Sequence, residues 1–166
     1  MWNSIIGHSR QIDELKRTLA SGNLPNAYLF QGPHGIGKRL VAETFAAACF
    51  CNDVCGTCLS CRKVINKNHP DCFIVEPESN QLSESESKTK KSENVKIEQV
   101  RELQSALQYH PLEAKMKIAI IDEAERMTES CANSLLKILE EPPPNTHFIL
   151  ISAIPHKLLQ TIRSRC

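Results

Sequence analysis

Two kinds of segment are missing from this sequence of 166 residues. The N-terminal stretch MWNSIIGHSRQIDELKR lacks the apolar run of a signal peptide and carries charges within its first turns. No stretch approaches the roughly 20 apolar residues that a membrane-spanning helix needs. We therefore expect a cytoplasmic protein without a membrane partner.

Strong net charge and aromatic side chains are also scarce. The formal net charge is +1, and aromatic residues make up 5% of the chain. A nearly neutral chain has no overall field that recruits nucleic acid, and single-strand binding modules need a basic groove and stacking faces. These absences count against a zinc-ribbon nucleic-acid module. Any contact with DNA would have to come from a local patch or from partner subunits.

Cysteine, in contrast, is abundant, with eight residues. Disulfides are disfavoured in a reducing cytosol, where clustered cysteines more often bind metal. A C-x₃-C-x₂-C-x₂-C spacing suits tetrahedral coordination of a structural Zn²⁺. The candidate ligands are Cys51, Cys55, Cys58 and Cys61. Cys49 competes with Cys51 as first ligand, but we expect Cys49 to lie within a helix and favour Cys51. Unligated buried cysteines and a redox C-x-x-C pair are the alternatives.

The apolar pattern predicts helices that alternate with buried strands. Expected helices cover about 10–20, 38–50, 61–68, 97–107, 128–141 and part of 155–166, with Ser9 and Thr128 as N-caps and Gly22 past the end of the first. Expected strands cover about 26–30, 72–76, 118–121 and 147–152. Strands that are apolar on both faces and joined by helices indicate an α/β fold, a parallel sheet covered on both sides. Residues 78–94 are rich in serine and charge, and we expect a mobile surface loop there. Cys72 and Cys131 are expected in the core.

A glycine-rich segment, GPHGIGKR, stands between the first expected strand and a helix, which is the context of a phosphate loop. Such a loop points backbone N–H groups at phosphate oxygens, and its lysine adds a charge. The candidate nucleotide-binding residues are Gly32, Pro33, His34, Gly35, Ile36, Gly37, Lys38 and Arg39. Arg39 stands where a serine or threonine normally ligates Mg²⁺. ATP binding therefore stays open, and we expect Mg²⁺ to add little. A chance glycine turn is the alternative.

Two acids follow the strand expected at 118–121. In phosphate-loop ATPases, the first acid after this strand holds Mg²⁺ and a second orients the attacking water. Asp122 and Glu123 are the candidates for these roles, and the missing hydroxyl at position 39 suggests that they are vestigial. A strand that simply ends in two solvated acids is the alternative.

Taken together, these motifs resemble those of bacterial clamp-loader AAA+ subunits of DNA polymerase III. The stretches AYLFQGPHGIGK, the four-cysteine insert, HPD, IIDEAERMT, ANSLLKILEEPP and TIRSRC occur in that order in the family, so the resemblance covers nearly the whole chain except the serine-rich loop. Delta-prime subunits, whose loops are often degraded, are the better match. Gamma/tau motor subunits carry threonine or serine after the loop lysine. The chain departs from the family in a shorter first cysteine spacing.

The resemblance implies an AAA+ P-loop NTPase domain over residues 1–166, with a small zinc module at about 49–63. It implies a stator that helps to load the sliding clamp onto primed DNA, with weak or absent ATP hydrolysis of its own. Implied partners are the gamma/tau and delta subunits. Family members continue into a helical lid and a collar, so this chain resembles an N-terminal domain that should be monomeric alone. An active motor of the gamma/tau type is the alternative, and turnover with Mg²⁺ separates the two.

The last residues of the chain include two arginines, Arg163 and Arg165, beyond the final expected strand. Arg165 is a candidate arginine finger that reaches the nucleotide of a neighbouring subunit, and the resemblance implies that this neighbour is a motor. In that case Cys166 would be a packing residue without a part in the zinc site. A solvated arginine at a helix end is the alternative.

Overall fold

A four-stranded parallel sheet forms the centre of the chain in the computed structural model, which describes residues 1–77 and 94–166. The strands are β1 (Ala27–Gln31), β2 (Cys72–Val75), β3 (Lys117–Ile121) and β4 (Thr146–Ser152), in the order β1-β4-β3-β2. All three pairings are parallel. The predicted parallel sheet is therefore confirmed.

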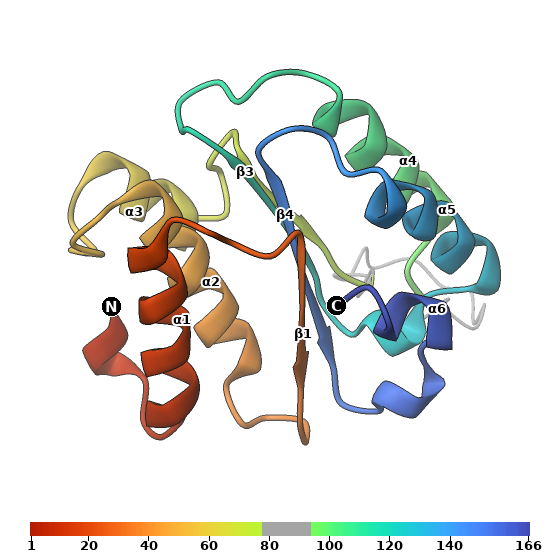
Figure 1. The fold of residues 1–166 in the computed structure, drawn as a ribbon, viewed down its shortest axis with the longest axis horizontal. Coiled ribbons are helices and arrows are strands. Elements are labelled where there is room, and N and C mark those ends of the chain that lie inside the picture. Colours follow the sequence, from red (N-terminus) through yellow and green to blue (C-terminus); the bar gives the residue numbers. More distant parts are fainter. Residues whose placement is uncertain (78–93) are drawn as a thin grey trace, which may run out of the picture.

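Helices cover both faces of the sheet (Figure 1). One layer contains α1 (Ser9–Ser21), α2 (Lys38–Phe50) and α3 (Leu59–Ile65), and the other contains α4 (Ile97–Leu107), α5 (Glu129–Glu140) and α6 (Gln160–Arg163). Short 3-10 turns complete the chain: η1 (Trp2–Ser4), η2 (Ala124–Arg126) and η3 (Pro155–Lys157). The expected serine-rich loop, except for its last residue, falls outside the described residues.

The central strands explain why the sequence is apolar without alternation. Every residue of β3 is buried, and successive side chains point to opposite faces. Ile118 and Ile120 pack in the cluster that contains Phe45 of α2, whereas Ala119 and Ile121 pack in the cluster that contains Leu135 of α5. The sheet thus separates two cores, one under each helix layer.

Helix ends follow the predicted signals with one exception. Thr128 caps α5, since its hydroxyl oxygen accepts a hydrogen bond from the Cys131 N–H at 3.3 Å. Gly22 ends α1 with a φ of 69°. The predicted N-cap at Ser9 is wrong: Ser9 is already helical, and His8 precedes it in the left-handed conformation. A serine one residue inside the helix cannot take the capping geometry.

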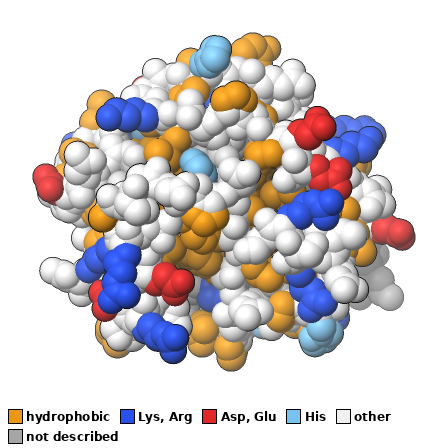
Figure 2. All heavy atoms as spheres, in the orientation of Figure 1, with side chains coloured by type: hydrophobic (Ala, Val, Ile, Leu, Met, Phe, Trp, Pro, Cys, Tyr) orange, Lys and Arg blue, Asp and Glu red, His pale blue; other side chains and the backbone are white. Residues whose placement is uncertain are grey.

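β1 is one of the two edge strands of the sheet and pairs only with β4 among the described residues. Apolar side chains gather over this part of the molecule (Figure 2). A groove of about 600 Å³ lies here, with Leu15, Tyr28, Phe30 and Val41 in its lining. Cys166 also lines this groove and is exposed. Within the described ranges, no helix combines the length and the apolar composition needed to cross a membrane.

Candidate functional sites

The glycine-rich loop and the two acids meet at one edge of the sheet. The loop follows β1 and Asp122 follows β3, and the carboxyl ends of parallel strands share an edge. Gly35 and Gly37 take φ angles of 78° and 93°, which let the loop curl before α2 begins at Lys38. A pocket of about 430 Å³ is lined by residues of both motifs. The structure therefore brings together the residues that the sequence singled out separately.

Lys38 is turned back onto its own loop. Its Nζ donates to the carbonyl oxygens of Gly32 at 2.6 Å and Pro33 at 2.7 Å. From the other side, His8 Nε2 lies 2.6 Å from the Ile36 carbonyl oxygen. Contacts from Lys38 and His8 thus hold the loop in this conformation.

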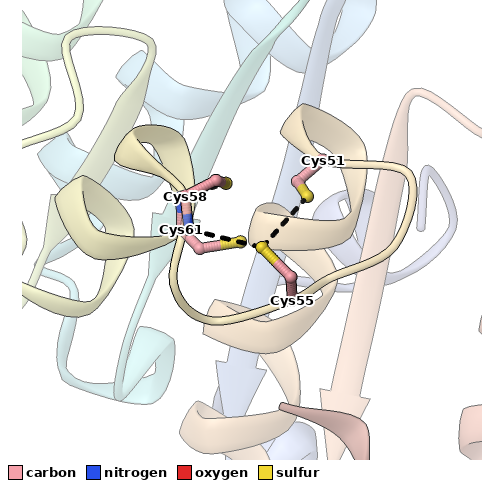
Figure 3. A group of neighbouring side chains, drawn as sticks. All are labelled: Cys51, Cys55, Cys58 and Cys61. Carbon is pink, nitrogen blue, oxygen red and sulfur yellow. Dashed lines mark hydrogen bonds between the residues drawn. The ribbon is translucent and has the colours of Figure 1, made fainter.

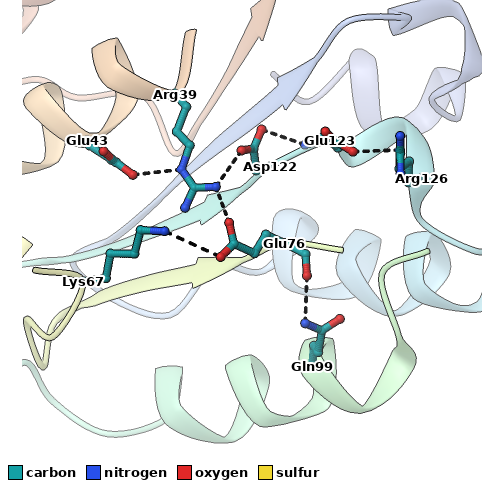
Figure 4. Close-up of polar contacts among 8 residues, drawn as sticks. All are labelled: Arg39, Glu43, Lys67, Glu76, Gln99, Asp122, Glu123 and Arg126. Carbon is teal, nitrogen blue, oxygen red and sulfur yellow. Dashed lines mark hydrogen bonds and ion pairs between the residues drawn. The ribbon is translucent and has the colours of Figure 1, made fainter. Parts of the chain in front are cut away.

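Arg39 is the centre of an ion-pair network (Figure 4). Its Nε donates to Glu43 Oε1 at 2.9 Å, and its Nη1 donates to Asp122 Oδ2 at 3.1 Å and to Glu76 Oε2. Burial by itself would lower the pKa of Arg39, but the hydrogen bonds to Glu76 and Glu43 outweigh it and raise the pKa. The same contact with Arg39 holds the pKa of Glu76 below its usual value. Arg39 is therefore a permanent cation among three carboxylates.

Glu76 is a site residue that the sequence reasoning missed. It stands directly after β2, at the sheet edge that also carries the loop and Asp122. An acid immediately after a buried strand was the available signal, the same one that identified Asp122. It was overlooked because no motif contains it.

The second acid is also paired with an arginine. Glu123 adopts a left-handed conformation with φ of 47°, and its Oε2 lies 2.7 Å from Arg126 Nε. Its backbone N–H donates to Asp122 Oδ1 at 2.9 Å. Asp122 and Glu123 thus each contact the guanidinium of a different arginine.

Mg²⁺ does not fit this arrangement. A phosphate-loop NTPase holds the ion with the loop serine or threonine and with the aspartate after the neighbouring strand. Here the first position is Arg39, which cannot ligate a cation, and the second position, Asp122, is bound to that arginine. The loop and Asp122 therefore do not offer the Mg²⁺ ligands of a phosphate-loop NTPase.

A buried carboxylate adds to the negative charge of the pocket. The Glu125 side chain is 4% exposed, and its Oε1 accepts a hydrogen bond from the Ala153 N–H at 3.1 Å. Burial would raise the pKa of Glu125, but hydrogen bonds from backbone N–H groups and Ser152 outweigh it and lower the pKa. Sequence reasoning did not identify Glu125. A fixed anion here disfavours a polyphosphate that lacks a counter-ion.

Four cysteine thiols form a compact cluster (Figure 3). The Sγ atoms of Cys51, Cys55, Cys58 and Cys61 all lie within 4.8 Å of one another. Cys51 and Cys55 sulfurs are 3.9 Å apart, close to the edge of about 3.8 Å that a tetrahedron with metal–sulfur bonds of about 2.3 Å requires. The four residues fit Zn²⁺ by ligand chemistry and by spacing.

Local structure positions these thiols. Cys51 directly follows α2, and Cys58 caps α3 with its sulfur accepting from the Cys61 N–H at 3.5 Å. Hydrogen bonds, the largest from Thr57, lower the pKa of Cys55 to about 6, whereas burial raises the pKa of Cys61 to about 12. A cation among the sulfurs would favour the thiolate form of all four.

Cys49 lies apart from the cluster, within α2, as expected. It packs in the same core cluster as Cys72, and burial raises the pKa of Cys49 to about 12. Cys131 is fully buried, which confirms its place in the core, and Cys72 is half-buried against the core.

The HPD segment has a structural role that sequence reasoning did not assign. Asp71 is fully buried, and its carboxylate accepts backbone hydrogen bonds from Leu112 at 2.7 Å and from Glu113 and Ala114 at 2.8 Å each. Burial would raise the pKa of Asp71, but these donors outweigh it and lower the pKa. Asp71 therefore anchors the loop before β3.

Arg165 lies after α6, and it does not line the pocket of its own chain. Its Nη2 contacts Glu140 Oε1 at 2.7 Å, and its Nη1 donates to the Thr161 carbonyl oxygen at 2.9 Å. The side chain is 35% exposed. Arg165 is therefore held at the surface by contacts within its own chain. Its action on the nucleotide of a neighbouring subunit stays a prediction.

Comparison with known sequences gives consistent relatives. The family described as "DNA polymerase III, delta subunit" matches residues 7–166. The chain is 39% identical over 146 residues to DNA polymerase III subunit delta′ of Pseudomonas aeruginosa, covering 85% of this chain and 41% of that protein. It is 37% identical over 156 residues to subunit delta′ of Bacillus subtilis, covering 92% and 44%. Subunit tau of Escherichia coli is 31% identical over 167 residues, covering 98% and 24%. The chain thus spans less than half the length of these relatives.

Solved structures agree on the fold. A gamma-subunit-related protein of Thermotoga maritima matches with a TM-score of 0.64 and 27% identity, covering 93% of this chain and 43% of that one. The RuvB Holliday junction branch migration motor from the same organism matches with a TM-score of 0.55 and 18% identity, covering 96% and 43%, and shows the fold alone. Both comparisons support the predicted AAA+ architecture.

Proposed function

The chain belongs to the delta-prime family of DNA polymerase III clamp-loader subunits, and from that premise we propose that it acts as a stator. In this role it helps to open the sliding clamp and load it on primed DNA as a component of the polymerase holoenzyme in the bacterial cytoplasm. Its partners would be the gamma/tau and delta subunits. The lid and collar implied by the resemblance would lie in the part of such proteins that this chain does not span.

The observation that carries the proposal is the pairing of both candidate catalytic acids with arginines. Asp122 is 3.1 Å from Arg39, and Glu123 is 2.7 Å from Arg126. An aspartate bound to a guanidinium is not free to hold Mg²⁺, and a paired glutamate is not free to orient water. We therefore expect ATP hydrolysis by this chain to be weak or absent.

An active motor of the gamma/tau type is the second candidate. Lys38 and both acids are retained, and tau subunits match nearly the whole chain. Steady-state hydrolysis of ATP with Mg²⁺ by the full-length protein, in the absence of partners, separates the two. Absence of turnover supports the stator; robust turnover supports the motor.

The cysteine cluster has a structural role in this proposal. Cys51, Cys55, Cys58 and Cys61 would hold one Zn²⁺, which cross-links the end of α2 to the start of α3. Four thiolates fill a tetrahedral shell and leave no open position for catalysis.

Arg165 would act on the nucleotide of a neighbouring motor subunit. Its permanently charged fork could stabilise charge there, once it leaves Glu140. Arginine fingers accelerate hydrolysis by about 10³ to 10⁵ at a single site in other systems, and a ring with several sites should lose less.

The decisive experiment reconstitutes the full-length protein with gamma/tau and delta subunits and measures clamp- and DNA-stimulated ATPase together with clamp loading. Arg165→Ala should preserve assembly and lower the stimulated ATPase several-fold, whereas the nearby Arg163→Ala should change it little. Normal ATPase and loading with Arg165→Ala would remove the proposed finger. Failure of the unaltered protein to enter the complex would contradict the stator role itself.

A further inference from the structure

Three carboxylates from three separate elements converge on Arg39. Glu43 lies one turn further along α2, Glu76 follows β2, and Asp122 follows β3. The Arg39 side chain is 29% exposed, so these contacts are partly shielded from water. Lys67 approaches Glu76 as well, but at 3.7 Å and from a position that is 52% exposed.

Such a set of carboxylates normally requires a compensating cation. Clustered carboxylate oxygens are the ligands that hard divalent cations prefer, and without a cation they repel one another. Arginine supplies the charge without a metal because its guanidinium stays protonated and presents several donors in a fixed fork. The hydrogen bonds from Nε and Nη1 use that fork.

We propose that Arg39 replaces the divalent cation of the loop site. Its charge neutralises the three carboxylates, and its contacts fix the start of α2 against the ends of β2 and β3. This arrangement forms without a bound metal ion or nucleotide. The inference deepens the proposal that this chain hydrolyses little or no ATP, and it rests on that part of the proposed function. It predicts a latent cation site that appears only when the arginine is removed.

The test is thermal unfolding of the full-length protein without nucleotide, with and without Ca²⁺ or Mg²⁺. Arg39→Ser should lower the Tm by about 5 °C in buffer without added divalent cation, because three carboxylates lose their partner. With Ca²⁺ at about 10 mM, binding at a millimolar Kd should restore about 3 °C. The unaltered protein should shift by less than about 1 °C under the same conditions. Chelators are avoided, since they would also remove zinc from the cysteine cluster.

Two further variants make the result specific. Arg126→Ser removes the guanidinium that contacts Glu123, which is not one of the three carboxylates around Arg39, and should produce no cation response. Arg39→Lys keeps a charge but loses the fork, so it should lower the Tm less than Arg39→Ser and give no cation response. If Arg39→Ser yields no folded protein, Arg39→Gln, which removes the charge but keeps a long polar side chain, takes its place in the same measurement.

Stabilisation of the unaltered protein by Ca²⁺ or Mg²⁺, equal to that of Arg39→Ser, would overturn the inference. An Arg39→Ser protein that keeps the original Tm and ignores cations would overturn it too. Neither result depends on assembly or hydrolysis. A protein that fails to join the clamp loader contradicts the proposed function alone, and a cation response of the unaltered protein without nucleotide contradicts this inference.

Discussion

The cysteine cluster and the carboxylates around Arg39 both bring several potential metal ligands together, but they differ in what neutralises them. Among the thiols, neutral groups donate to the sulfurs: the Cys58 N–H lies 3.3 Å from the Cys55 sulfur, and the Cys61 N–H lies 3.5 Å from the Cys58 sulfur. Among the carboxylates, a guanidinium already stands at hydrogen-bond distance. One cluster therefore fits an external cation, and the other holds a cation supplied by the chain.

Ligand type and proximity therefore do not by themselves define a metal site. The charge left after the protein's own contacts decides whether an ion is needed. A motif search that counts acids would place Mg²⁺ at Asp122, and the contacts of Asp122 argue against it.

The largest expected effect is the loss of zinc from the cysteine cluster. Cys58→Ser removes one ligand and the cap of α3, so bound zinc should fall from about one equivalent to none and the free energy of unfolding should drop by about 4 kcal/mol or more. Metal analysis of reduced protein and thermal unfolding measure the two quantities.

Cys49→Ser is the matched control for this variant, because Cys49 lies next to the module but outside the cluster. It should keep its zinc. Zinc lost from Cys49→Ser and retained by Cys51→Ser would show that the first ligand is assigned wrongly. A reduced, purified protein without zinc would refute the metal site as a whole.

Acid should separate the two clusters. Protons compete with zinc for thiolates, so zinc affinity falls as the pH falls. The pKa of Glu76 is lowered, so its ion pair with Arg39 is fully present above its unfolded pKa near 4.5 and is lost only as the pH falls through its lower folded value.

We therefore expect zinc release to begin above about pH 4.5, while the Arg39 network is intact. A zinc indicator and near-UV circular dichroism, followed over one acid titration, measure the order. Simultaneous loss of zinc and global structure near pH 4 would contradict the expected separation.

A smaller loss of stability is expected at Asp71, whose carboxylate is held by backbone N–H donors and not by a cation. Asp71→Asn loses the charge and one acceptor oxygen, so the free energy of unfolding should fall by about 2 kcal/mol at neutral pH. The pKa of Asp71 is lowered, so its contribution is present above about pH 4 and disappears as the pH falls through the folded value. The variant and the unaltered protein should converge there.

Glu113→Gln provides the control for Asp71→Asn. It removes the charge of a partly exposed partner of Lys63 and should change the stability by less than about 1 kcal/mol. Denaturant unfolding measures the free energy of unfolding of both variants. Equal decreases would mean that the Asp71 carboxylate stabilises the fold no more than an exposed ion pair does.

The parallel sheet, the strand–loop–helix context of the glycine-rich segment and the cysteine spacing could all be predicted from the sequence. Each of these depends on local patterns: continuous apolar runs such as Ile118–Ile121 need cover on both faces, and thiols a few residues apart can reach one ion. The choice of Cys51 over Cys49 also followed from local reasoning, because Cys49 belongs to a helix, and the structure places Cys51 in the cluster.

The contacts within the loop site, in contrast, became apparent only in the folded chain. In the sequence, Arg39 indicates only that the hydroxyl that normally ligates Mg²⁺ is absent. In the fold, its guanidinium contacts Glu76, which lies 37 residues away, and Asp122, which lies 83 residues away. The same holds for the three donors around Asp71, which lie 41 to 43 residues from it. Contacts at such separations depend on strand order and on which strand ends share an edge. Local propensity predicts neither the strand order nor which strand ends lie together, because it arises from interactions within a few residues of the chain.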